Sequence, residues 1–359
     1  MAARSRTRGV LSYLLPATII FCYYITPTTA MRSYTQYENF FPAWDHIIKE
    51  QLTNSCTEPL NNYKNRSDPT RQLGYHVIDC ILDTMPEFRK AELASAAVIL
   101  GLAPTVLQLM SASHLDTAML AYRRPVLASL LSMSSSGVRP LTATEYDGFI
   151  TAMGTDPFHT NFGKPQSVWA PAVVSMLEYI VASAAVANNA YLAYELSTLA
   201  VCTFSPAEDF LPAVWTAAAV AIHLVGYLAA RLKISVKGKG GGKENNNRDR
   251  LLYRVWAELT PTPWQSRLEV KTNDKHTGWF LVLVSVLYIG DALQAFYGTL
   301  ILSSLVFISV RDSAIIVIRL MASALFARGI LIYELAGFRM ERDGNHESGK
   351  PRYSAVETQ

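Results

Sequence analysis

Residues Trp279 to Ala336 read WFLVLVSVLYIGDALQAFYGTLILSSLVFISVRDSAIIVIRLMASALFARGILIYELA. This stretch consists of two long apolar runs joined by one polar tetrapeptide, Val310–Ser313. An α-helix rises 1.5 Å per residue, so about 20 apolar residues cross the ~30 Å hydrocarbon core of a bilayer. Each run therefore predicts a membrane-spanning helix, and the two together predict a helical hairpin over residues 277–336.

Three further apolar segments are long enough to span a bilayer: Glu92–Met110, Trp169–Phe204 and Phe210–Ala230. With the hairpin they make five spans. Half of the residues are apolar and only 17% are charged, and the net charge of +3 is too small to indicate a nucleic-acid partner. We expect an all-α, polytopic transmembrane helical bundle with a small outer segment, and the lipid bilayer as its partner.

The N-terminus has the layout of a secretory signal. Arg4, Arg6 and Arg8 precede the apolar run Gly9–Ile25, and Ala30 ends a small-residue site suited to cleavage. Residues 1–30 are therefore either a signal peptide or an uncleaved signal anchor. Both alternatives send the following residues across the membrane.

Residues 31–90 are polar and predict a luminal or extracellular segment. Cys56 and Cys80 close a loop of about 25 residues, and a disulfide there would contribute ~3–4 kcal/mol in an oxidising compartment. The alternative is two free buried cysteines. Asn65-Arg66-Ser67 is a glycosylation sequon, which fits an outer position and predicts a glycoprotein.

Residues 91–230 hold the first three body spans and a loop, 111–168, expected in the cytoplasm. Within it, Val126–Met133 is apolar but too short to span, and we expect it to lie in the membrane interface. Residues 231–276 carry eleven Lys and Arg against five Asp and Glu, which predicts a flexible cytoplasmic linker near anionic lipid. Residues 337–359 predict a disordered cytoplasmic tail.

The positive-inside rule sets the orientation. With residues 31–90 outside, every strongly basic loop and the C-terminus fall in the cytoplasm. The predicted location is a membrane of the secretory route or the plasma membrane.

Ionisable residues inside spans are candidate functional sites. In an antiparallel hairpin, residues whose numbers sum to a constant lie at equal depth. This rule pairs Asp291 with Arg328 near the cytoplasmic side, and it leaves Arg319 opposite Ser303 and Ser304 without an acidic partner.

The preceding pair of spans gives a second candidate cluster by the same rule. Asn188, Asn189 and His223 fall at similar depth and could form interhelical hydrogen bonds. A packing role and a role in an ion, proton or ligand path both remain open for these residues.

No pattern of catalytic or metal-binding residues is visible in the sequence. The four cysteines have no C-x-x-C spacing, and the seven histidines form no H-E-x-x-H motif. We therefore assign no catalytic residue, metal or cofactor.

Several stretches resemble a group of polytopic integral membrane proteins of filamentous fungi. They include CILDTMPEFRKAELASAAVILGLAPTVLQLM, YRRPVLASLL, ANNAYLAYEL, PAVWTAAAVAIHL, YGTLILSSLVFISVRD and RLMASALFARGILIYELAGFRM. The resemblance covers most of Cys80–Met340. It implies a multi-span fold with a cysteine-containing outer segment, and it carries no activity or catalytic residues over to this chain.

Three functional hypotheses follow. The first is an interaction or organising membrane protein, the second a transporter or channel that uses intramembrane polar residues, and the third a membrane-embedded enzyme. The first hypothesis requires the fewest special features. A transporter-like internal repeat and a set of catalytic residues, which would favour the other two, are not evident in the sequence.

Overall fold

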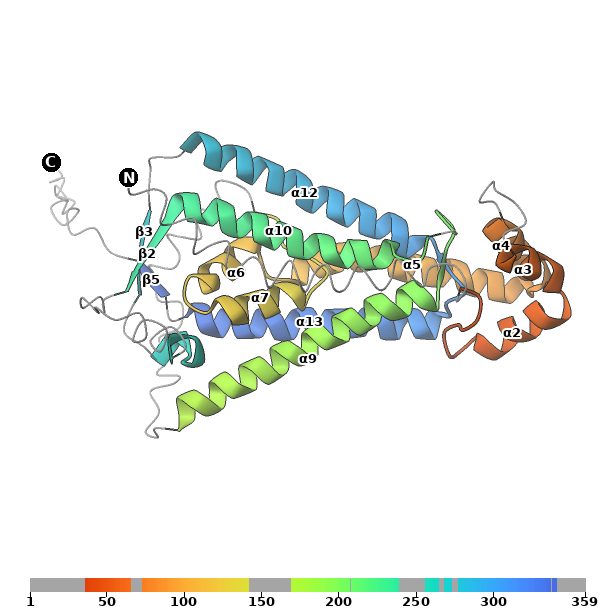
Figure 1. The fold of residues 1–359 in the computed structure, drawn as a ribbon, viewed down its shortest axis with the longest axis horizontal. Helices are drawn as coiled ribbons and strands as arrows, with labels where there is room; N and C mark the ends of the chain where they lie inside the picture. The colour runs from red at the N-terminus through yellow and green to blue at the C-terminus, as the bar shows by residue number, and fades with distance from the viewer. Residues whose placement is uncertain are drawn as a thin grey trace, which may run out of the picture.

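The computed structural model describes residues 36–65, 73–141, 169–206, 208–238, 256–264, 268–272, 277–336 and 338–340. The expected signal segment, residues 1–30, lies outside these ranges. In the described part a long helical bundle carries a small helical domain at one end and a three-stranded sheet at the other (Figure 1).

Within the described ranges, five helices are long and apolar enough to cross a membrane, which confirms the predicted all-α polytopic fold. They are α5 (Glu87–Met110), α9 (Ala170–Thr198), α10 (Leu211–Lys233), α12 (Thr277–Ser303) and α13 (Val310–Leu335). Trp169 and Trp279 are exposed at the starts of α9 and α12. Exposed tryptophans at helix ends are typical of a membrane–water interface. The chain is an integral membrane protein.

Helices α12 and α13 do not form the simple hairpin that the sequence predicts. Helix α5 lies between them: α12 packs against α5 and α10, and α13 packs against α5 and α9 (Figure 1). A Cβ atom added to Gly101 of α5 would lie 3.1 Å from Cβ of Ser303 on α12. The lack of a side chain on α5 thus allows close approach of the backbones.

The connection between α12 and α13 also differs from the expected polar knuckle. The residues Val310–Ser313 form the first turn of α13, and the Ser309 hydroxyl caps this helix by accepting a hydrogen bond from the Asp312 N–H. The connector is instead the apolar sequence before Ser309. Within it, β4 (Leu305–Val306) pairs with β1 (Val201–Cys202).

The segment predicted to lie outside forms a small domain of α2 (Asp45–Asn54), α3 (Thr57–Lys64) and α4 (Leu73–Thr84), and we name it the outer domain after that prediction. Cys56 and Cys80 are joined as a disulfide across its α3–α4 pair. The domain packs directly on the end of the bundle. Phe307 is fully buried there, and its ring meets that of Phe40 edge-on at 5.9 Å. The apolar connector thus serves as a docking surface and not as part of a span.

The segment after α5 folds back into the bundle. It forms α6 (His114–Ala121), α7 (Pro125–Met133) and a non-helical stretch to Leu141. Helix α6 packs against α10 and α13, and α7 packs against α9 and α10. The expected interfacial position of Val126–Met133 is therefore wrong for most of α7, because Leu127, Ala128 and Leu131 are buried against spans.

At the end opposite the outer domain, the chain forms a small sheet. β2 (Ile234–Gly238) pairs antiparallel with β3 (Leu268–Thr272), which pairs in parallel with β5 (Phe338–Met340). The short helix η1 (Thr262–Trp264) lies in the same loop. Strand pairing satisfies the backbone N–H and C=O groups of these residues. The expectation of a flexible linker is therefore wrong for 234–238 and 268–272, and that of a disordered tail for 338–340. The remaining residues of the predicted tail lie outside the described ranges.

Candidate functional site

Among the described residues, three groups of buried and half-buried polar side chains lie at successive levels of the bundle. The inner cluster comprises six residues at the end near the sheet: Arg124, Ser175, Glu178, Glu258, Thr262 and Glu334. The central layer comprises five residues deeper in the bundle: Gln108, Ser136, Asn189, Thr216 and Gln294. The third level, nearer the outer domain, holds Asn188, Glu195 and Arg319.

Arg124 is the centre of the inner cluster. Its side chain is fully buried, and Nη1 donates to carboxylates of both Glu178 on α9 and Glu334 on α13. Nη2 donates to the Ser175 hydroxyl at 2.7 Å, and Nε donates to the carbonyl oxygen of Glu258 at 2.8 Å. Burial alone would lower the pKa of Arg124, but Glu334 and Glu178 raise it. The guanidinium therefore stays charged and joins three elements.

Glu258 fastens the loop segment 256–264 to α7. Its Oε1 accepts the backbone N–H groups of Val126 and Leu127, in the first turn of α7, and the Tyr179 hydroxyl at 2.7 Å. A carboxylate at a helix N-terminus satisfies free N–H groups and the helix dipole. Burial raises the pKa of Glu258, whereas these hydrogen bonds act in the opposite direction.

The other end of the same segment is held by α13. Glu334 Oε2 accepts hydrogen bonds from the Thr262 N–H at 3.2 Å and from its hydroxyl. Arg123 donates to the carbonyl oxygens of Thr260 and Pro261. Segment 256–264 is thus a clasp that links α7, α9 and α13.

The central layer holds the non-helical stretch after α7 in place. Ser136 donates to Asn189 Oδ1 at 2.8 Å, and Asn189 Nδ2 donates to the Met133 carbonyl oxygen at 3.0 Å. Gln294 of α12 donates to the Ser136 carbonyl oxygen. Backbone N–H and C=O groups of a non-helical stretch inside a membrane bundle need hydrogen-bond partners from the protein.

Asp291 lies on α12, one turn from Gln294, and differs from every other buried acid described above. Its side chain is fully buried, and neither carboxyl oxygen accepts a hydrogen bond from the described residues. The expected pair with Arg328 is wrong, because Arg328 donates instead to the carbonyl oxygens of Leu109 and Met110. α5 separates the two helices, so the equal-depth rule does not apply.

Asp291 also lies deeper than the sequence suggested. α12 continues through Gly290 without interruption from Thr277 to Ser303, which places Asp291 near its midpoint. The position near the cytoplasmic side that the equal-depth rule gave Asp291 is therefore wrong.

The expected cluster of Asn188, Asn189 and His223 does not form. Asn189 faces the central layer, and His223 Nδ1 lies 2.9 Å from the Thr117 hydroxyl of α6. Asn188 faces α13, where its Nδ2 donates to Ser323 at 2.8 Å. Neighbours in sequence point about 100° apart on a helix, and the equal-depth rule ignores this rotation.

Arg319 has the acidic partner that the sequence analysis did not find. Its Nη1 lies 2.7 Å from Glu195 Oε2 on α9, and its Nε donates to Asn188 Oδ1 at 3.0 Å. The partner lies on α9 because α9, and not α12, packs beside α13.

His114 lies at the start of α6, against Gly226 of α10. A Cβ atom added to Gly226 would lie 2.5 Å from the Cβ of His114. Burial lowers the pKa of His114 to about 4. The imidazole is therefore neutral at physiological pH.

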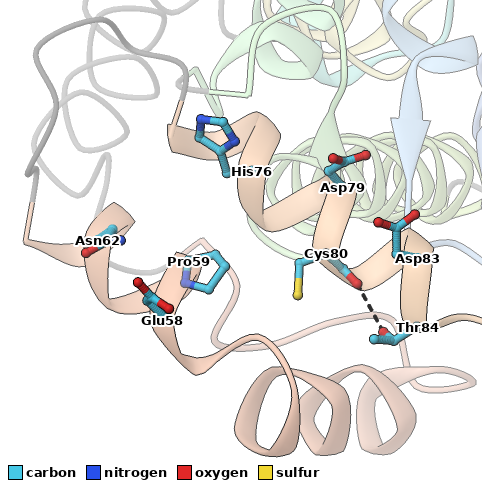
Figure 2. Close-up of a pocket in the computed structure, with 8 residues that line it drawn as sticks. All are labelled: Glu58, Pro59, Asn62, His76, Asp79, Cys80, Asp83 and Thr84. Carbon is cyan, nitrogen blue, oxygen red and sulfur yellow. Dashed lines mark hydrogen bonds between the residues drawn. The ribbon is translucent and has the colours of Figure 1, made fainter.

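The outer domain contains a hollow of about 430 Å³ between α3 and α4. Figure 2 shows its lining side chains, which are Glu58, Pro59, Asn62, His76, Asp79, Cys80, Asp83 and Thr84. Three of the eight are carboxylates. Asn65, the predicted glycosylation site, is exposed at the C-terminal end of α3.

Sequence reasoning missed the inner cluster because it assigned Arg124 to a cytoplasmic loop. The available signal was the apolar run directly after Arg124-Pro125, together with Glu178 and Glu334 inside or at the end of long apolar helices. An acid in such a place needs a buried cation.

Among the described residues, no group of three or more His, Cys, Asp and Glu side chains could hold a metal ion. Comparison with protein-family models, with curated proteins and with solved structures gave no match for this chain.

Proposed function

We propose that this integral membrane protein is an interaction protein, whose bundle holds the outer domain at a fixed position for a partner on the outer side. The observation that carries the proposal is the way the outer domain is docked. Its Phe40 packs on Phe307 in the connector between α12 and α13, so the domain contacts the bundle directly.

The docking contact also includes a polar link. Asp312, in the first turn of α13, accepts a hydrogen bond from the Ala43 N–H just before α2. The buried cluster of the outer domain continues into Val201 and Val306 of the β1–β4 pair. The domain thus packs on two connections between spans, the one between α9 and α10 and the one between α12 and α13. Such contacts keep its orientation constant, and this pre-organisation lowers the entropic cost of binding a partner.

The hollow between α3 and α4 is the binding surface in this proposal. Glu58, Asp79 and Asp83 give it a negative charge, which favours a basic segment of a partner protein. At the other end of the bundle, the ion pairs of the inner cluster join α9 and α13 through Arg124, which fits a structural role for the spans.

Site-specific photocrosslinking in the full-length protein tests the proposal. A photoreactive residue at Asn62, inside the hollow, should give an adduct of one defined mass, whereas one at Glu50 on the exposed face of α2 should not. The double variant Asp79→Lys, Asp83→Lys should reduce the adduct by about fivefold, because two rim charges contribute roughly 0.5 kcal/mol each. Equal adducts from both positions, or no effect of charge reversal, would contradict it.

A transporter or channel is the second candidate, and one observation favours it. The stretch from Ser134 to Leu141 is non-helical inside the bundle, as in proteins where such a segment lines a path. In a background without Cys22 and Cys202, a Ser136→Cys variant would react with a membrane-impermeant maleimide if water reached this level. Complete protection there, with full labelling of Glu50→Cys, would exclude an open aqueous path.

A further inference from the structure

Asp291 lies on the inward face of α12, in line with Leu287 and Gln294. All three are buried, and Asp291 is completely shielded from solvent. Gly290 precedes Asp291 in the helix. A Cβ atom added to Gly290 would lie 4.0 Å from Cγ1 of Ile222 on α10. Val138 packs with Leu287 and Ile222 in one apolar cluster. The carboxyl group thus sits between apolar side chains near the middle of a span.

Asp291 accepts a hydrogen bond from another helix through its backbone carbonyl oxygen, and not through its side chain. Gln108 on α5 donates to the Asp291 carbonyl oxygen at 2.8 Å, whereas both carboxyl oxygens lack a partner among the described residues. Asp291 is the only charged residue in the sequence of α12.

The helices packed against α12 offer no counter-charge to this carboxyl group. α5 carries its charged residues, Glu87, Arg89, Lys90 and Glu92, in its first two turns at the outer end. On α10, His223 is bonded to Thr117, while Arg231 and Lys233 lie over the rings of Tyr227 and Phe280 at the inner end.

Three charged residues of the described segments around α5 and α10 are also occupied or exposed. Arg139, in the stretch after α7, is exposed. Arg328 on α13 is bonded to carbonyl oxygens of α5, and Asp116 on α6 completes the capping box with Ser113.

Asp291 differs from three other acids of the bundle in having no arginine partner among the described residues. The buried Glu178 and Glu334 and the half-buried Glu195 each have an arginine partner, as expected for acids with a structural role. An unpaired carboxylate in an apolar interior is too costly to persist, and it is compensated by a cation or a proton. A metal ion requires several oxygen ligands, whereas Val138, Ile222 and Leu287 are apolar. The side-chain amides of Gln108 and Gln294 donate to the carbonyl oxygens of Asp291 and Ser136. A proton needs only the carboxyl group itself.

We propose that Asp291 is a membrane-embedded proton-binding site. The O–H bond of its carboxyl group is kept while the bundle is closed. When water reaches the group, this proton passes to water and leaves a carboxylate, and it is regained when the bundle closes. The step changes the charge of the bundle core by one, without any redox change, and it extends the protein's properties beyond the partner binding proposed above.

Dicyclohexylcarbodiimide tests the proposal, because it reacts with protonated carboxyl groups in apolar surroundings. We expect peptide mass spectrometry of the full-length protein in detergent to find the adduct on Asp291 at about pH 6, with at least a threefold loss at about pH 9. Glu178 and Glu334 serve as paired controls in the same molecule, and the Asp291→Asn variant should lose the adduct. Protection by sodium at constant pH would overturn the proposal in favour of a metal-ion site.

Infrared difference spectroscopy provides a measurement that does not depend on reagent access. The spectrum of the wild type minus that of Asp291→Asn at neutral pH should contain the carbonyl stretch of a protonated carboxylic acid. A carboxylate band in its place would show that the group is ionised and would overturn the proposal.

Discussion

Arg124 connects more parts of the molecule than any other residue of the inner cluster. Its guanidinium reaches α9 through Glu178, α13 through Glu334 and the clasp through the Glu258 carbonyl oxygen. A buried ion pair adds little net stability compared with apolar residues, but the removal of one partner leaves an uncompensated charge. The residue therefore sets which elements meet at the inner end.

The variant Arg124→Met should lower the free energy of unfolding by about 3–5 kcal/mol, because two buried carboxylates lose their cation. Arg311→Gln, at an exposed position at the start of α13, is the matched control and should stay within about 0.5 kcal/mol of wild type. Thermal unfolding of the detergent-solubilised protein, followed by fluorescence-detected size exclusion, measures both. The triple variant with Glu178→Leu and Glu334→Leu should recover part of the loss, because the carboxylates are gone but the buried Thr262 donors lose their acceptor. Equal stability of Arg124→Met and Arg311→Gln would contradict this account.

At the scale of elements, the segment from α6 to Leu141 gives the bundle its internal polar layer. It enters between α10 and α13 and presents Ser136 to Asn189 and Gln294. Its entry requires close packing on α10. Gly226 provides this, because a side chain there would overlap His114 at the start of α6. The short helices therefore depend on a position in another span.

The variant Gly226→Ala should destabilise the protein by about 1–3 kcal/mol, because a methyl group would force α6 away from α10. Gly329→Ala is the control within another span. Nothing lies within 4 Å of a Cβ atom added there, so the lower backbone entropy of alanine should make that variant neutral or up to about 1 kcal/mol more stable. Thermal unfolding in detergent compares the two. Equal effects of both substitutions would show that the α6–α10 contact is not tight.

At the scale of the whole molecule, the outer domain and the small sheet lie at opposite ends of the bundle (Figure 1). The described parts of the basic loop lie at the end with the sheet. The Cys56–Cys80 disulfide lies in the outer domain, at the opposite end. A disulfide and a positive-inside distribution both predict that α2–α4 face the outer side of the membrane.

This orientation predicts that Asn65 carries a glycan when the protein is made in a eukaryotic secretory route. Glycosidase treatment should increase the gel mobility of the wild type and leave that of Asn65→Gln unchanged. Asn62→Gln, three residues away and outside any sequon, should behave like the wild type. If glycosidase treatment leaves wild-type mobility unchanged, the outer assignment of α2–α4 would lack support.

The sequence by itself determined the number of spans and the fold class, because the length of an apolar run is a local property set by the thickness of the bilayer. It also singled out Cys56 and Cys80, since spacing in a polar outer segment is visible without a structure. Only the tertiary structure decided which helices are neighbours. α5 enters between α12 and α13, so Asp291 and Arg328 never meet, and Arg319 finds Glu195 on α9. Lateral contacts in a bundle depend on which helix faces meet, and hydropathy along one chain does not contain that information.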